Sequence, residues 1–165
     1  MITQTPRLLL RNLTETDAQH FYELNLDPDV LQYTGDSVFE SVEAARVFLT
    51  NYQNVYKKYG FGRWAVIRKE DNAFLGWCGL KYSEDTKEHD LGFRFFKKYW
   101  GNGYATEAAL ASVQWGFTQP AITEIVGRAM EANSASIRVL EKCGMKLRNF
   151  FDFEGEDGVV YSINR

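Results

Sequence analysis

Cysteine and histidine are scarce in this sequence, which contains two of each among 165 residues. Cys78 and Cys143 lie far apart and form no CxxC pair, so they do not predict a disulfide framework. His20 and His89 lack the spacing of metal ligands, and we expect no bound metal. This use of cysteine is typical of a reducing compartment, and we expect a cytoplasmic protein.

Excess basic charge and long apolar runs are also missing. The formal net charge is −3, whereas nucleic-acid partners usually require a basic patch, so we expect no nucleic-acid partner. No apolar run approaches the length of a membrane span. The first residues, MITQTPRLLLR, lack the apolar stretch and cleavage site of a signal peptide. We therefore expect no membrane association.

Hydrophobic and aromatic residues are plentiful, at 45% and 15% of the chain, which is enough to build a substantial core. There are only three prolines, and no Gly- or Pro-rich segment is long enough to act as a linker. No internal repeat or low-complexity segment is present. The sequence therefore predicts a single domain over residues 1–165.

The hydrophobic patterning predicts a mixed α/β fold. A possible capping box at Thr14–Asp17 opens a first helix, and a second helix is expected to begin near Ser41 and end at Gly60. Two further helices are predicted at 103–117 and 134–143. Strands are predicted at 7–13, 63–69, 74–82, 89–96, 124–130, 146–153 and 159–164. Short loops join several of these strands, which favours a mixed sheet of six to seven strands with helices on both faces.

The segment KYWGNGYA, from Lys98 to Ala105, places two glycines between an apolar strand and an alanine-rich helix. Glycines at such a join leave backbone N–H groups uncovered, and the N-terminus of the helix adds partial positive charge. Gly101 and Gly103 therefore predict an anion site, with the charge of Lys98 close by. The Walker motif is absent, and the dinucleotide fingerprint fits poorly because Thr106 replaces its third small residue. A tight turn without a ligand is the remaining alternative.

The same segment resembles the acetyl-CoA signature of the GNAT superfamily of N-acetyltransferases, Q/R-x-x-G-x-G/A. It is most similar to the branch of the ribosomal-protein alanine N-terminal acetyltransferases. Four other segments resemble that branch in the same order along the chain. They are TPRLLLRNLTETDA, DPDVLQY, LGF at 91–93 and EANSASIRVLEKCGM.

This resemblance implies a GNAT-like fold with a splayed central pair of strands and acetyl-CoA as the co-substrate. The pyrophosphate would contact the turn, and the pantetheine arm would pair with the backbone of a free strand edge. One backbone N–H of that strand would polarise the thioester carbonyl. Asn133, which could alternatively cap a helix, and Ser136 would contact the cofactor arm. The implied cofactor-binding residues are Phe93, Phe95, Lys98, Gly101, Asn102, Gly103, Tyr104, Ala105, Asn133 and Ser136.

The implied reaction is direct attack of a primary amine on the thioester, through a tetrahedral intermediate. The amine must be neutral to attack, and Asp90, or else Glu88, could accept its proton through water. Leu140 stands where many relatives carry a tyrosine acid, and leucine cannot donate a proton. Ser136, water or no group at all would then protonate the leaving thiolate. The alternatives are that Asp90 is a solvated loop acid, or that it forms a dyad with His89.

The acceptor is expected to be a primary amine, either a protein N-terminus or a small amine. Tyr33, Asp36, Trp64 and Trp77 are candidate lining residues, although aromatic residues are more often part of the core. We expect a monomer or a homodimer. Two other functions stay open: a non-catalytic acyl-CoA-binding or regulatory module, and a dinucleotide-binding enzyme.

Overall fold

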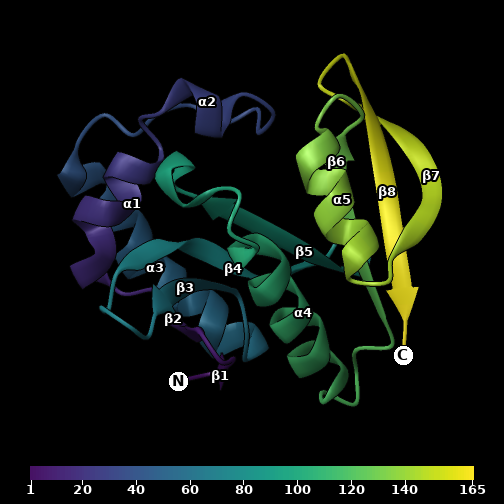
Figure 1. Ribbon diagram of the computed structural model, residues 1–165, viewed down its shortest axis with the longest axis horizontal. Helices are drawn as coiled ribbons and strands as arrows, with labels where there is room; N and C mark the ends of the chain where they lie inside the picture. The colour runs from purple at the N-terminus through teal and green to yellow at the C-terminus, as the bar shows by residue number, and fades with distance from the viewer.

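The structure is a computed structural model that describes all 165 residues (Figure 1). Eight strands form one sheet in the order β1-β2-β3-β4-β5-β6-β8-β7. The strands are β1 (Thr3–Gln4), β2 (Leu8–Asn12), β3 (Arg63–Arg68), β4 (Phe74–Ser83), β5 (Glu88–Phe95), β6 (Glu124–Met130), β7 (Lys146–Phe153) and β8 (Glu156–Asn164). The helices are α1 (Ala18–Leu24), α2 (Pro28–Leu31), α3 (Val42–Tyr59), α4 (Tyr104–Phe117) and α5 (Ser134–Lys142).

The predicted α/β architecture is confirmed, and two details of the prediction are wrong. The sheet has eight strands instead of six to seven, because Thr3 and Gln4 pair with Leu10 and Leu9. A short helix, α2, forms where no helix was predicted. Its start is stabilised by the Asp27 side chain, which accepts a hydrogen bond from the backbone N–H of Asp29, and by a proline in the first turn.

The sheet separates two apolar clusters, one on each face. Helices α4 and α5 cover one face, in front of the sheet in Figure 1, and α1 and α3 cover the other. Ala108, Ala109 and Ser112 form the small face of α4 and are fully buried, so this helix lies close to β4. Ser112 Oγ lies 3.4 Å from the sulfur of Cys78 on that strand. The small residues of α4 thus serve close packing on the sheet.

The central pair of strands is splayed, as predicted. β5 and β6 are the only parallel neighbours, and their pairing covers just two positions, Asp90 with Val126 and Leu91 with Gly127. Beyond these positions β5 stays paired with β4, while β6 stays paired with β8 along its whole length. Each strand follows its own half of the sheet, and the two diverge (Figure 1). The edge of β5 that faces β6 is therefore free over residues 92–95.

Candidate functional site

The glycine turn forms the N-terminal end of α4. Gly101 and Gly103 have φ angles of 78° and 79°, in the left-handed region that other residues rarely adopt. Gly103 is the N-cap of the helix. The backbone N–H groups of residues 101–106 donate no hydrogen bond within the protein. A Cβ placed on Gly101 would meet no atom within 4 Å, so this row of donors is open.

Two arginines from the other half of the sequence flank this turn. Arg7 donates to the carbonyl oxygen of Asn102 over 3.0 Å, and its guanidinium lies 4.4 Å from the ring centre of Tyr104. Arg68 donates to the Tyr104 hydroxyl over 3.3 Å. With exposed Lys98, these residues place three basic side chains around the turn, of which Arg7 is paired with Glu107 and Arg68 with Asp71, each over 2.7 Å. Sequence reasoning missed both arginines, because no local motif connects them with the glycines.

Asn133 follows β6 and acts as the N-cap of α5. Its Oδ1 accepts a hydrogen bond from the backbone N–H of Ser136 over 3.2 Å. The capping alternative is therefore realised, while Nδ2 of the same side chain makes no hydrogen bond within the protein and can still serve a ligand. Contact of Asn133 with a cofactor stays a prediction.

Ser136 and Leu140 occupy the same face of α5, one turn apart. Leu140 is 2% exposed and packs against β6, so that a Cβ on Gly127 would lie only 2.6 Å from Leu140 Cδ2. Leu140 is therefore a core residue. Ser136 is half-buried, and its hydroxyl makes no hydrogen bond within the protein, which leaves it free to donate.

Asp90 and Glu88 lie at the closed end of the splay, among arginines. Asp90 Oδ2 is 3.2 Å from Arg63 Nη2, and its Oδ1 is 3.7 Å from Arg128 Nη1. Burial raises the pKa of Asp90, and the two arginines offset this only in part. Burial also acts to raise the pKa of Glu88, but the hydrogen bond and charge of Arg128, with a contribution from Arg148, bring it below its ordinary value. Glu88 is thus held as an ion-paired carboxylate.

The geometry rules out a dyad of His89 and Asp90. Side chains of neighbouring residues in a strand point to opposite faces, and His89 packs against the rings of Tyr82 and Phe61. Burial lowers the pKa of His89. Asp90 faces Arg63 on the other side of the sheet and is no solvated loop acid. Its role as a base stays a prediction.

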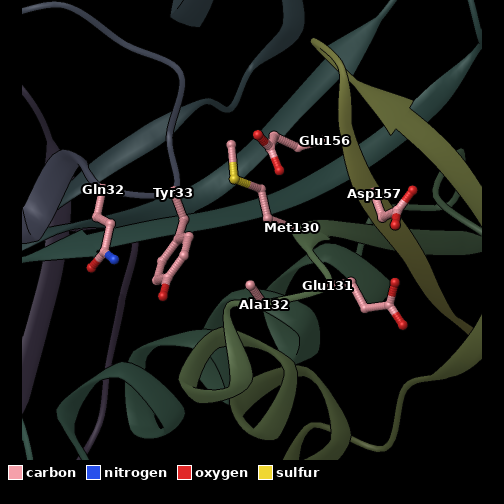
Figure 2. A pocket seen from close by; sticks show the side chains of 7 residues that line it. All are labelled: Gln32, Tyr33, Met130, Glu131, Ala132, Glu156 and Asp157. Carbon is pink, nitrogen blue, oxygen red and sulfur yellow. The ribbon is translucent and has the colours of Figure 1, made fainter.

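One cavity lies between the segment after α2 and the adjoining ends of β6 and β8, and has a volume of about 590 Å³ (Figure 2). Tyr33, one of the predicted lining residues, lies on one side of it, and Met130 lies at the end of β6. Three carboxylates line the opposite side: Glu131, Glu156 and Asp157. None of the three forms an ion pair, so this cavity favours cations.

The second cavity, of about 410 Å³, lies under α1 and α3 on the same face of the sheet as Asp90. Trp77 and Asp36 line it, as predicted, together with several phenylalanine rings. The prediction for Trp64 is wrong. Trp64 is fully buried, and its ring centre lies 5.0 Å from that of Trp115 in the core. It points to the opposite face of the sheet from Arg63, its neighbour in β3.

Comparison with known proteins identifies the family. Residues 7–146 match the family model described as the acetyltransferase (GNAT) domain. The chain belongs to the GNAT acetyltransferase family. It is 34% identical over 144 residues to the protein YkkB of Bacillus subtilis, and this match covers 86% of the chain and 83% of YkkB. These matches identify an N-acetyltransferase.

Solved structures have the same fold. A GNAT-family acetyltransferase from Bacillus anthracis superposes with a TM-score of 0.82 at 28% identity, covering 98% of this chain and 96% of that one. The ribosomal-protein acetyltransferase RimL, solved with coenzyme A, superposes with a TM-score of 0.85 at 17% identity, covering 99% and 97%. The resemblance of the fold to the ribosomal-protein branch is thus confirmed.

Two absences complete the description of the site. No group of three or more His, Cys, Asp and Glu side chains is arranged to hold a metal ion. No helix combines the length and apolarity needed to cross a membrane.

Proposed function

We propose that residues 1–165 form one catalytic domain that transfers the acetyl group of acetyl-CoA to a primary amine. The observation that carries this proposal is the open row of N–H donors at residues 101–106, beside the free edge of β5. The donors, the helix dipole and the cations Arg7, Arg68 and Lys98 suit a pyrophosphate. The free edge suits a peptide-like arm. Coenzyme A bound in the RimL structure is consistent with this use.

The roles of the chain's own residues follow from their positions. Backbone donors of Gly101–Ala105, with the side chains of Lys98, Asn102 and Tyr104 around them, would hold the phosphates. The backbone of Phe93 and Phe95 would pair with the arm, since no neighbouring strand uses that edge of β5. When bound, acetyl-CoA supplies a thioester that an amine can attack.

Proton transfer can be assigned to Ser136 and Asp90. The unpaired hydroxyl of Ser136 lies near the start of α5, on the side of the splay where the cofactor would enter, and would donate to the leaving thiolate. A free thiol has a pKa of about 8.5, so little help from an acid is needed there. Asp90, which lies at the closed end of the splay on the acceptor side, would accept the proton of the amine through water. Its raised pKa makes it a better base than an ordinary aspartate.

The acceptor would approach through the 410 Å³ cavity, on the face of the sheet that carries Asp90, or past the 590 Å³ cavity at the ends of β6 and β8. The three unpaired carboxylates beside Tyr33 and Met130 would attract a protonated amine to the mouth of the splay. This arrangement suits both a protein N-terminus and a small amine.

A thermal-shift measurement tests the cofactor first, with acetyl-CoA and coenzyme A against NAD and ATP. A ligand at one hundred times its dissociation constant stabilises a protein by about 2.7 kcal/mol. For a chain of this length, that corresponds to a rise in Tm of roughly 5–11 °C. A rise with NAD or ATP but none with the coenzyme A ligands would contradict the proposal and favour a dinucleotide-binding enzyme.

Release of free thiol in the presence of an amine panel then tests catalysis. The panel should include a peptide N-terminus, a polyamine and amino acids. Stabilisation by acetyl-CoA without amine-dependent thiol release from any of them would favour the non-catalytic acyl-CoA-binding module.

A further inference from the structure

Trp77 and Lys81 of β4 and Arg94 of β5 line the floor of the 410 Å³ cavity, and they belong to a ladder of cross-strand pairs between these two strands. Trp77 faces Arg94, Gly79 faces Gly92, and Lys81 faces Asp90. The glycine pair in the middle has no side chains, and the guanidinium of Arg63 lies flat over it. A Cβ on Gly92 would be only 2.7 Å from Arg63 Cζ. The glycine pair thus brings a guanidinium to the floor of the cavity.

Cations outnumber anions among the residues that line this cavity. The guanidinium groups of Arg63 and Arg94 each lie 5.3 Å from a ring centre of the Trp77 indole. Lys81 lines the cavity as well and forms no ion pair. Asp36 is the only carboxylate in the lining. Arg94 is paired with Asp36 and Arg63 with Asp90 just outside the lining, so Lys81 carries the unpaired positive charge.

The arginines are held in place but retain free donors. Arg94 is 11% exposed and is bound through its two terminal nitrogens by Asn25 and by Asp36, the latter over 2.6 Å. Its Nε is buried and has no hydrogen-bond partner. Arg63 donates to the carbonyl oxygens of Gly79 and Asp90 and to the Asp90 carboxylate, and its Nε makes no hydrogen bond. A buried donor without an acceptor is costly. Because Arg94 Nε is covered by protein atoms, Arg63 Nε is the guanidinium donor that an anionic ligand would use.

The walls of the cavity are aromatic. The rings of Phe21, Phe39 and Phe48 lie 5.6 Å apart, centre to centre, and all three line the cavity. Phe48 is 43% exposed although it lies beside two other rings, so part of its surface is open to a ligand. The cavity therefore combines cations at its floor with an apolar wall.

The cavity adjoins the strand that would hold the cofactor. Arg94 lies between Phe93 and Phe95 in β5, and its side chain points to the opposite face. A ligand on Arg94 would therefore occupy the acceptor side of the strand whose edge the cofactor arm would use. Gly92 and Asp90, further along the same strand, continue this face towards the closed end of the splay.

We propose that this cavity binds the carboxylate of an amino-acid-like acceptor, with Arg63, Lys81 and Arg94 around the carboxylate and an aromatic or apolar side chain against Phe21, Phe39 and Phe48. The proposal rests on the proposed function, because it names the class of amine that the site acetylates. An acceptor of this class carries a carboxylate, whereas simple polyamines carry no anionic group, so the proposal distinguishes this enzyme from one that selects polyamines.

Calorimetric titration of the protein without acetyl-CoA tests the cavity separately from catalysis. The probes are N-acetyl-L-phenylalanine and its neutral amide. They have the same skeleton and side chain, and differ only in that one carries a carboxylate and the other a carboxamide. We expect the carboxylate to bind at least about tenfold more tightly, as for loss of one hydrogen bond to a charged group. Equal affinities, or no binding of either probe at about 10 mM, would overturn the proposal.

Two variants test whether the tighter binding of the carboxylate probe arises in this cavity. Arg94→Gln removes the buried donor but also breaks the contacts to Asn25 and Asp36, so it can unfold the protein. Lys81→Gln avoids this problem because the side chain is exposed and unpaired. We expect Lys81→Gln to reduce the preference several-fold, and Lys142→Gln, an exposed lysine on α5, to leave it unchanged. A preference that survives Lys81→Gln in full would place the probe elsewhere and refute the assignment.

Thiol release with phenylalanine and with phenethylamine, its analogue without the carboxylate, then tests the acceptor class. A higher kcat/KM for phenylalanine supports the proposal, and a higher value for phenethylamine contradicts it. If neither amine is acetylated although another amine of the panel is, the assignment of the acceptor class fails. If no amine of the panel is acetylated while the calorimetric preference holds, the proposed function fails and the anion-binding cavity stands.

Discussion

Gly101 offers a sharp test of whether the glycine turn serves a ligand or only the backbone. The variant Gly101→Ala adds one methyl group at a residue with φ of 78° and no atom within 4 Å of the new Cβ. Gly60, which ends α3, provides a matched control, because its φ is 79° and its Cβ position is equally open. A left-handed conformation costs an alanine about 1–2 kcal/mol. Both variants should therefore lose roughly 2–8 °C in Tm.

Binding of acetyl-CoA should separate the two variants. At Gly101 the methyl group would project beside the unpaired N–H groups and displace the pyrophosphate from one or two of them. Each hydrogen bond to a charged group contributes about 1.5–3 kcal/mol, so a loss of about a hundredfold in affinity is expected. At an acetyl-CoA concentration one hundred times the wild-type dissociation constant, stabilisation would fall from about 2.7 to about 0.4 kcal/mol.

Thermal shift with and without acetyl-CoA measures both quantities in one experiment. Gly60→Ala should keep the full rise in Tm on adding the ligand, from a lower starting point. Gly101→Ala should lose most of that rise. If the two variants respond equally to acetyl-CoA, the glycine turn serves the chain conformation alone, and the assignment of the pyrophosphate site is refuted.

Three further predictions concern the acid, the charge network and the core. Because a thiolate leaves with little help from an acid, Ser136→Ala should lower kcat by less than about 10²-fold, with little change in KM for acetyl-CoA in steady-state assays. Ser134→Ala, at the exposed first residue of α5, should leave kcat unchanged, and equal rates for the two variants would remove Ser136 from the mechanism. Glu88 has a lowered pKa, so its ion pair stabilises the fold above the unfolded-state value of about 4.3 and is lost as the pH falls below it. Denaturant titrations from pH 6 to 3 should therefore show a flatter decline for Glu88→Gln than for wild type or for exposed Glu23→Gln, and parallel curves would exclude this contribution. Leu140→Ala should cost about 2–5 kcal/mol in unfolding free energy by denaturant titration, because the side chain is fully packed on β6; a cost below about 1 kcal/mol would mean that it is not a core residue.

Much of the fold could be predicted because its signals are local. Ser41 and Gly60 mark the ends of α3, as an N-cap that accepts a hydrogen bond from Ala44 and a left-handed C-cap. Asn72, with a φ of 57°, lies in the predicted turn between β3 and β4. The two-residue strand β1 could not be predicted, because it exists only through its pairing with β2.

The candidate site was predictable in part. The glycine turn and the capping of α5 by Asn133 follow from short spacings in the sequence. Two arginines flank the turn: Arg7, just before β2, and Arg68, the last residue of β3. Only the folded sheet brings them beside α4. The burial of Trp64 and the exposure of Trp77 to a cavity likewise depend on which face of the sheet each occupies.

The sequence by itself determined the order of helices and strands, the left-handed turn before α4 and the residue types available for chemistry, because turns, caps and periodicity depend on neighbours along the chain. Only the tertiary structure decided where β5 leaves β6, that Asp90 lies between Arg63 and Arg128, and that Arg63 covers a pair of glycines. These features arise from strand register and from the burial of charge between segments distant in sequence. Local sequence patterns encode neither strand register nor contacts between distant segments. The residues on the acceptor side of the site could therefore be identified only from the tertiary structure.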